Sequence, residues 1–433
     1  MSALGYKIPE EVLNELKEHA LSCIRCGFCE PGCPTLKPLG YKIMFSPRGR
    51  KQLARGLLQG ELKLSKELYE SFFTCLHCED CEQACPGSLN SGIVSLLMRQ
   101  VIVENAKDLL DKELTLSMDI LSKRDNPVGI STDDLTSWVK KLKGKVDIPE
   151  EGNTILYTSN LYTLMPYSHA ALRLTRGEWV KKMMGFVKMP GGMGLAARFV
   201  KSATPKELVE RFESILEKIA LLLHMAGVKF AYTRKEIYGG MLAYDFGFVD
   251  LFKKQASKAI GILKKAGAKR VVTTDPHTTE TLEVIAPKYL GYSDLEVVHY
   301  LELLKDKICD LNPYFEEEVT VVIHDPCRLA RGLNKHTLLR EVLGKVKNLK
   351  IVEPTRTGLR TSCCGSPVEA IRPELASKIA EDRAQELTSK SKVVVTACPI
   401  CLAALLEPVE KLGGKVYDIA EILYAAVTSH KLE

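Results

Sequence analysis

The chain has 433 residues, of which 45% are hydrophobic, and its 60 Lys and Arg exceed its 54 Asp and Glu, which gives a net charge of +6. This composition supports packed cores and excludes a disordered protein, and the length predicts about two to four domains. So mild a positive charge does not indicate nucleic-acid binding.

The beginning of the sequence argues against export. The stretch after Met1 is polar and amphipathic, unlike a cleaved secretory signal. The longest apolar run, Ile219–Val228, contains a histidine and is too short to span a bilayer. We therefore expect a cytoplasmic protein without its own transmembrane segment, either free or held on the cytoplasmic face of the membrane through a partner. There, the 14 cysteines are expected to be ligands or redox groups rather than disulfides.

Residues 1–123 are predicted to form a helical domain. Apolar residues have helical spacing in segments 9–22, 48–60, 66–73 and 90–110, and no strand alternation occurs among them. The pattern C-x2-C-x2-C-x3-C-P occurs twice, at Cys23–Pro34 and Cys75–Pro86. Each copy is therefore expected in a loop at the end of a helix.

This spacing is that of two-cluster ferredoxins, where three thiolates of one motif and the last of the other hold each cluster. It predicts one [4Fe–4S] cluster on Cys23, Cys26, Cys29 and Cys85, and another on Cys75, Cys78, Cys81 and Cys33. Structural zinc, in a zinc-structured interaction protein, is the alternative. Zinc sites usually join two separated C-x2-C pairs, however, and not two quartets that each end in proline.

Residues 124–151 are predicted to be a linker, because they begin with a stretch rich in Asn, Pro, Gly, Ser and Asp. After the linker, short β-branched runs alternate with helical stretches, which indicates α/β domains with largely parallel sheets. The expected strands are 153–159, 269–274, 295–300, 318–325, 391–397 and 415–419.

This region contains an internal repeat of helix, strand, proline turn, helix, glycine turn, strand and helix. Asp275 corresponds to Cys398, Thr278 to Cys401, and Glu236–Met241 to Ser362–Pro367. We therefore expect two tandem α/β modules, 152–305 and 306–433, packed face to face with a cleft between them. The first module has no cysteines.

The second module holds five thiols that form a separate site, namely Cys327, Cys363, Cys364, Cys398 and Cys401. Two of them, Cys327 and Cys398, come directly after predicted strands, so the thiols should converge at the carboxyl edge of the sheet. Five thiols exceed the four ligands of a tetrahedral zinc ion.

Together with the double ferredoxin motif, this array resembles the CCG-domain iron–sulfur oxidoreductases. The chain is similar to the D subunit of heterodisulfide reductases, to the iron–sulfur subunits of glycolate oxidase and anaerobic glycerol-3-phosphate dehydrogenase, and to the K subunit of the Dsr membrane complex. The resemblance implies an α plus α/β fold, a helical ferredoxin domain followed by two CCG modules. It also implies a non-cubane [4Fe–4S] cluster on the five thiols. The first module departs from the family pattern, because it lacks the cysteines for a second such cluster.

The resemblance implies an oxidoreductase subunit of the heterodisulfide reductase type. Electrons would pass through two [4Fe–4S] clusters to or from the C-terminal site, which would act on a thiol or disulfide substrate. The alternative is a relay subunit of a flavin-dependent 2-hydroxy acid (glycolate or lactate) or glycerol-3-phosphate dehydrogenase that delivers electrons to quinone. No G-x-G-x-x-G motif follows a strand, so any flavin would be on a partner. In either case we expect a complex with a flavoprotein or membrane cytochrome subunit, docked against the helical domain.

Three ionisable residues near the five thiols are candidates for a chemical role. Arg328 and Arg331 could neutralise an anionic substrate or the cluster, and the alternative is that they are solvated helix charges. His324 is a candidate catalytic proton donor. The alternative for His324 is a buried histidine at a strand end without chemical function.

The remaining features have weaker signals. Cys309 is interpreted as a small packing residue or a free thiol. Asp275, His277 and Thr278 occupy the ligand positions of the first module, which we interpret as scaffold and partner surface rather than as a pocket facing the cluster. The Met-rich, basic segment Arg176–Ser202 is a candidate contact with a partner or membrane, with a core helix as the alternative.

Overall fold

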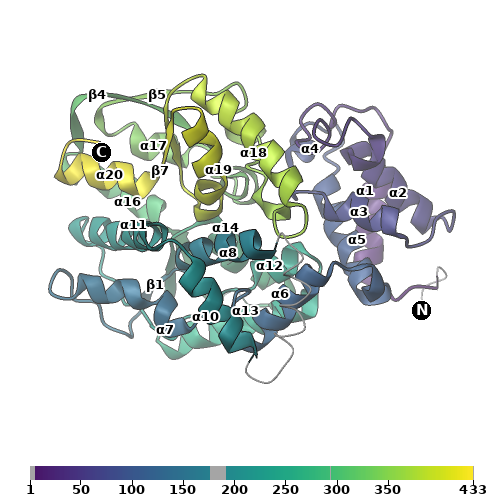
Figure 1. Ribbon diagram of the computed structural model, residues 1–433, viewed down its shortest axis with the longest axis horizontal. Helices are drawn as coiled ribbons and strands as arrows, with labels where there is room; N and C mark the ends of the chain where they lie inside the picture. The colour runs from purple at the N-terminus through teal and green to yellow at the C-terminus, as the bar shows by residue number, and fades with distance from the viewer. Residues whose placement is uncertain (1–4, 176–191, 293, 433) are drawn as a thin grey trace.

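The computed structural model describes residues 5–175, 192–292 and 294–432. A helical domain lies at one end of the molecule, and two α/β units lie beside it, one above the other in the view of Figure 1. We call these the first unit, which carries the sheet of β1, β2 and β3, and the second unit, which carries the sheet of β4 to β7.

The helical domain confirms the interpretation of the N-terminal sequence. Its helices are α1 (Glu10–Leu21), α2 (Pro47–Leu58), α3 (Lys66–Phe73), α4 (Asp80–Gln83), α5 (Ser91–Asn105) and α6 (Lys112–Arg124). The side chains of Ser46, Ser65 and Asn90 accept hydrogen bonds from the first turns of α2, α3 and α5, as good N-caps do. The first cysteine motif follows the end of α1 in a loop, as expected. The second follows the end of α3 and differs from the expectation, because it includes the short helix α4, which carries Cys81.

The predicted linker is ordered and packed. It contains a short helix, α7 (Thr132–Leu135), and a 3₁₀ turn at Ser137–Leu142. Trp138 in this turn is fully buried, and its indole nitrogen donates to the Tyr232 hydroxyl at 3.3 Å. The segment is therefore fixed against the first unit.

The two sheets are parallel throughout the described chain. In the first unit β1 (Thr154–Tyr157), β2 (Arg270–Thr273) and β3 (Glu296–His299) lie in the order β1-β2-β3. In the second unit β4 (Tyr314–Ile323), β5 (Lys347–Val352), β6 (Val393–Thr396) and β7 (Lys415–Asp418) lie in the order β5-β4-β6-β7. The six expected strands are present, and β5 is an additional strand at the sheet edge.

Helices cover both sheets. Those of the first unit are α8 (Leu161–Thr175), α10 (Gly192–Ala203), α11 (Lys206–Met225), α12 (Met241–Asp245), α13 (Val249–Lys265), α14 (Pro276–Glu280), α15 (Ala286–Leu290) and α16 (Tyr300–Lys307). Those of the second unit are α17 (Leu338–Leu343), α18 (Pro373–Thr388), α19 (Pro399–Lys411) and α20 (Ile419–Thr428). Both α16 and α20 begin with a capping box that directly follows a strand, formed by His299 with Glu302 and by Asp418 with Glu421. That the two units are copies of one module remains a prediction.

The two units are joined through their buried faces. Tyr162 on α8 donates to the Asp418 carboxylate at 2.6 Å, and both side chains are buried. Arg211 on α11 forms an ion pair with Glu421 at 2.9 Å.

The segment Arg176–Ser202 is described only in part, because residues 176–191 lie outside the described ranges. The remainder belongs to α10, where Ala196, Ala197 and Val200 are buried while Leu195 and Phe199 are exposed. This part is an ordinary amphipathic helix.

Candidate metal centres

The first centre lies at the surface of the helical domain. Cys23, Cys26, Cys29 and Cys85 line one hollow of about 90 Å³, which therefore combines three thiols of the first motif with the last of the second. Cys26 is exposed and Cys29 is buried. Arg25, Arg48 and Lys51 also line the hollow and place positive charge beside the thiols, while burial raises the pKa of Cys29 to about 11.

The second centre lies deeper in the domain. Cys33, Cys75, Cys78 and Cys81 line a smaller hollow of about 20 Å³. Burial favours the neutral thiol of Cys75, but the nearby guanidinium groups of Arg50 and Arg99 outweigh burial and hold the pKa of Cys75 below its usual value. Both hollows thus gather the thiols that the spacing predicts, and four converging thiols with cationic neighbours suit an iron–sulfur cluster.

The five thiols of the second unit converge in the third centre. All five are buried, and Cys327 contacts Cys363, while Cys364 contacts Cys363 and Cys401, which in turn contacts Cys398. Cys327 and Cys398 follow β4 and β6, and Cys401 lies in the first turn of α19. Such a row of buried thiols in mutual contact suits a thiolate-bound cluster.

The glycine after the cysteine pair is required by the backbone. Gly365 has a φ of +94°, and a Cβ there would lie 2.5 Å from the carbonyl oxygen of Ala376. No other residue fits this left-handed position, which turns Cys363 and Cys364 inward from the loop before α18.

The five thiols differ in acidity. Hydrogen bonds from Cys363 and Cys401 lower the pKa of Cys364 to about 6. Burial opposes ionisation of Cys398, but hydrogen bonds from Cys401 and His277 outweigh it and hold its pKa well below the usual value. The site therefore favours thiolate at two of its five sulfurs before any metal arrives.

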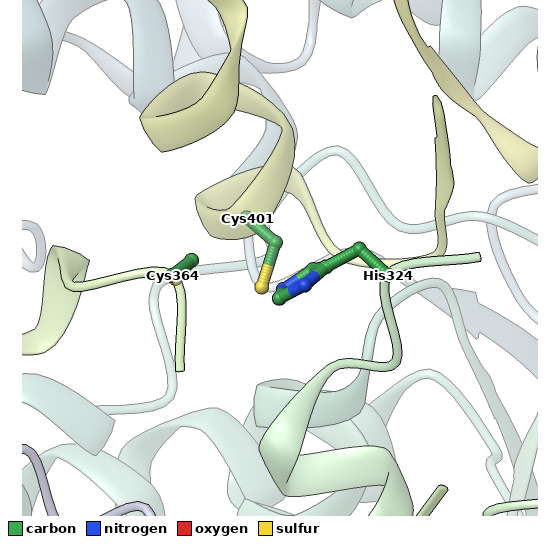
Figure 2. Close-up of side chains that lie close together, drawn as sticks. All are labelled: His324, Cys364 and Cys401. Atoms are coloured by element: carbon green, nitrogen blue, oxygen red, sulfur yellow. The ribbon is translucent and has the colours of Figure 1, made fainter. Parts of the chain in front are cut away.

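His324 lies among these thiols, at the end of β4. One of its ring nitrogens and the sulfurs of Cys364 and Cys401 lie within 4.8 Å of one another, and Figure 2 shows the Cys401 thiol directed toward the imidazole. Arg383 Nε donates to His324 Nδ1 at 3.1 Å, so the ring proton is on Nε2. Burial, together with Arg383, lowers the pKa of His324 to about 3, so the ring is neutral at physiological pH.

The first unit reaches this centre through α14. His277 is buried and hydrogen-bonded to Cys398. Asp275 caps α14 by accepting bonds from the backbone nitrogen of Thr278 at 2.9 Å and from its hydroxyl at 2.6 Å. Of the three residues that the predicted repeat aligns with the ligand positions, His277 thus faces the thiols, while Asp275 and Thr278 bond to each other.

Arg331 stands between the second and third centres. Its guanidinium donates to the carbonyl of Cys78 and to those of Leu359 and Thr361, and its charge interacts with Cys78, Cys327 and Cys363. The second quartet and the five thiols are therefore neighbours across one buried arginine. The alternative that Arg328 and Arg331 are solvated helix charges is wrong, because both are buried.

Asp80, inside the second cysteine motif, forms ion pairs with three arginines of the second unit. Its carboxylate lies 2.9 Å from Arg356 Nη2, 2.9 Å from Arg360 Nε and 3.8 Å from Arg331 Nη1, and Asp80 is only 1% exposed. We call this group the Asp80 clamp. It joins the helical domain to the second unit.

Arg328, the residue after Cys327, joins all three parts of the molecule. It forms ion pairs with Asp245 and Glu280 of the first unit and contacts His77 Nδ1 of the helical domain at 3.1 Å. Burial would raise the pKa of Asp245, but Arg328 holds it well below the usual range. The guanidinium charge is therefore already balanced by carboxylates of the protein.

Comparison with known proteins agrees with this arrangement. Residues 19–89 match the 4Fe-4S dicluster domain, and residues 321–406 match the Cysteine-rich domain known as CCG. The chain is related to the CCG-domain iron–sulfur oxidoreductases. In the ranges 5–175, 192–292 and 294–432, no helix combines the length and the apolar character that crossing a membrane requires.

Three relatives cover most of the chain at modest identity. A probable glycolate oxidase iron–sulfur subunit of Bacillus subtilis is 23% identical over 98% of this chain and 98% of its own length. The D subunit of the dihydromethanophenazine:CoB–CoM heterodisulfide reductase of Methanosarcina mazei is 23% identical over 94% of this chain and 93% of its own. The probable iron–sulfur-binding oxidoreductase FadF of Bacillus subtilis is 24% identical over 84% of this chain, but the match spans only 48% of FadF.

Several residues of the centres are absent from the sequence-based predictions. Asp80 is one of several acids within the second motif, and nothing in the sequence sets it apart. Its partners Arg356 and Arg360 lie more than 270 residues away, and Arg383 lies inside a helix with ordinary spacing. Cys309 is exposed, so it is a free thiol and not a packing residue.

Proposed function

We propose that this chain is a catalytic and electron-carrying subunit of an oxidoreductase complex of the heterodisulfide reductase type. Two [4Fe–4S] clusters would occupy the quartets of the helical domain, and a non-cubane [4Fe–4S] cluster would occupy the five thiols. The observation that carries the proposal is that Arg331 donates to the Cys78 carbonyl while its charge also acts on the Cys327 thiol, which makes the two sites neighbours. Electrons arriving at the surface quartet could then reach the buried thiols through the second quartet.

The proposed reaction is the reduction of a disulfide, or its reverse. Two electrons and two protons convert R–S–S–R′ into RSH and R′SH, and clusters supply electrons singly. The chain's own part is to bury the thiols and to place a hydrogen-bond donor beside them. His324 is that donor through Nε2, and because the ring is already neutral it does not release this proton, so both protons of the reaction would come from solvent.

A second candidate is a relay subunit of a flavin-dependent dehydrogenase of 2-hydroxy acids or glycerol 3-phosphate, with quinone as the final acceptor. It is supported by the similarity along nearly the whole chain to a protein named as a glycolate oxidase iron–sulfur subunit. In such a relay, the five thiols would hold a carrier of electrons and bind no substrate.

Electron paramagnetic resonance of the oxidised protein distinguishes the two candidates. If the five thiols form a site for thiol or disulfide substrates, adding a small thiol should produce a new signal or change an existing one. A relay with the same metal content should give spectra that do not depend on thiol. The thiol-independent result would therefore favour the second candidate.

We further propose that the partner, a flavoprotein or membrane cytochrome, docks at the first centre. Ile24 and Phe28 within the first cysteine motif, and Tyr41 and Ile43 in the segment that follows it, are 59–79% exposed, and Ile24 lines the hollow of the first quartet. Apolar side chains this exposed are typical of an interaction surface. The exposed Arg25 and Lys42 beside them would suit a partner with an acidic rim.

Phe28→Ser should remove most of the partner on copurification from native extracts, with the partner recognised by its flavin or haem absorbance. The iron content should remain at the wild-type level, since Phe28 is not a ligand. Val284→Ser, which changes an exposed apolar residue of the first unit, is the control. Equal recovery of the partner with Phe28→Ser and Val284→Ser would place the docking surface elsewhere.

A further inference from the structure

A narrow slot leads to the third centre from one side. It has a volume of about 120 Å³ and lies between α8 of the first unit and α18 and α19 of the second. Its walls carry small residues, Ala376 and Ala380 on α18 and Ala403 and Ala404 on α19. Of the five thiols, Cys364 is the one that lines the slot.

Protein groups lie against several of the other thiols. Arg331 and Cys78 lie beside Cys327 and Cys363. His277 lies against Cys398. Cys364 is the thiol that lines the slot, so it is the sulfur that a small molecule in the slot would meet.

The rim of the slot is ionic. Arg173 on α8 and Lys411 on α19 both pair with Glu407, at 3.0 Å and 2.9 Å. His169 lies 3.6 Å from Glu369 on the same rim. These side chains can bind the charged or polar end of a ligand, whereas the alanines of the walls suit a short apolar chain.

The dimensions limit what can enter. The space of about 120 Å³ is small and lies between helices. A short unbranched chain suits such a space better than a branched carbon beside the sulfur.

We propose that this slot is the entry path for an unbranched, low-molecular-weight thiol or disulfide, which enters sulfur first and leaves its polar end among the rim charges. The inference rests on the proposed thiol and disulfide function of the five-cysteine site, and it adds the path and the shape of the substrate. No residue of the slot other than Cys364 is a proposed metal ligand, so its walls can be changed without removing a ligand.

The test uses the oxidised, metal-loaded full chain. The measured quantity is the concentration of added thiol that gives half of the thiol-dependent spectral change. The probes are hydrosulfide, 3-mercaptopropionate and tert-butyl thiol. In the wild type, the first two should act and tert-butyl thiol should not. Ala404→Leu should raise the concentration needed for 3-mercaptopropionate at least tenfold and leave that for hydrosulfide unchanged.

Ala425→Leu, at a half-buried alanine of α20 away from the slot, is the matched control and should behave as the wild type. If Ala404→Leu loses iron, Ala403→Leu serves in its place, since Ala403 is a half-buried wall residue as well. The inference would be overturned if the leucine variant responded to 3-mercaptopropionate as the wild type does. It would also be overturned if the wild type responded to tert-butyl thiol as strongly as to 3-mercaptopropionate. A wild type that responds to none of the three probes would overturn the proposed function, and the slot with it.

Discussion

Asp80→Asn is expected to lower the free energy of unfolding by about 3 kcal/mol, because it leaves buried arginine charge without its carboxylate. The amide has nearly the shape of the carboxylate, so the change isolates the charge. Arg331 is the most affected partner, since its side chain is only 1% exposed, compared with 28% and 47% for Arg356 and Arg360. Loss of the clamp should also loosen the contact between the second quartet and the five thiols.

Urea unfolding of anaerobically purified protein measures the effect, and Asp382→Asn is its control. Asp382 pairs with Lys37 at 2.8 Å, but the two side chains are 41% and 65% exposed. An exposed pair of this kind contributes about 0–1 kcal/mol. If Asp80→Asn and Asp382→Asn had equal effects, the clamp would not be what joins the two domains.

The clamp also explains a glycine of the first motif. A Cβ at Gly32 would lie 1.9 Å from Asp80 Oδ2, and Arg356 Nη2 donates to the Gly32 carbonyl at 2.8 Å. The two cysteine motifs and the second unit therefore meet at one point. Gly32→Ala should disturb the same contact from the other side.

The sequence was most informative where spacing alone decides the structure. The repeated cysteine motif predicted which thiols share each hollow, because three close thiols on one loop can meet only one thiol of the other loop. The β-branched runs predicted six strands correctly, because each run is short and bounded by turns. The strand β5 was missed because it lies at the sheet edge, with Lys347, Asn348 and Lys350 exposed among its apolar residues.

Long-range charge pairing could not be predicted. Arg328 and Arg331 have the appearance of surface charges in the sequence, and their carboxylate partners lie between 48 and 251 residues away. Only the fold brings these residues together. The tautomer of His324 could not be predicted either, because Arg383, which fixes it, comes from the distant helix α18.

Cys398→Ser is expected to remove the metal of the third centre and to leave both quartets of the helical domain loaded. Cys398 contacts Cys401 and His277, and a serine oxygen is a poor ligand for the iron of such clusters. The spectrum of the two [4Fe–4S] clusters should remain, and the thiol-dependent signal should disappear. Thr278→Val, which changes the counterpart of Cys401 in the first unit, is the control and should keep every signal, as should a change of Asp275.

Anaerobic iron and acid-labile sulfide analysis of the purified wild-type chain tests the central claim most directly. Three clusters of four irons predict about twelve irons per chain, about eight after Cys398→Ser, and no stoichiometric zinc. A wild-type value near eight would mean that the five thiols hold no cluster, and would contradict the account of the third centre.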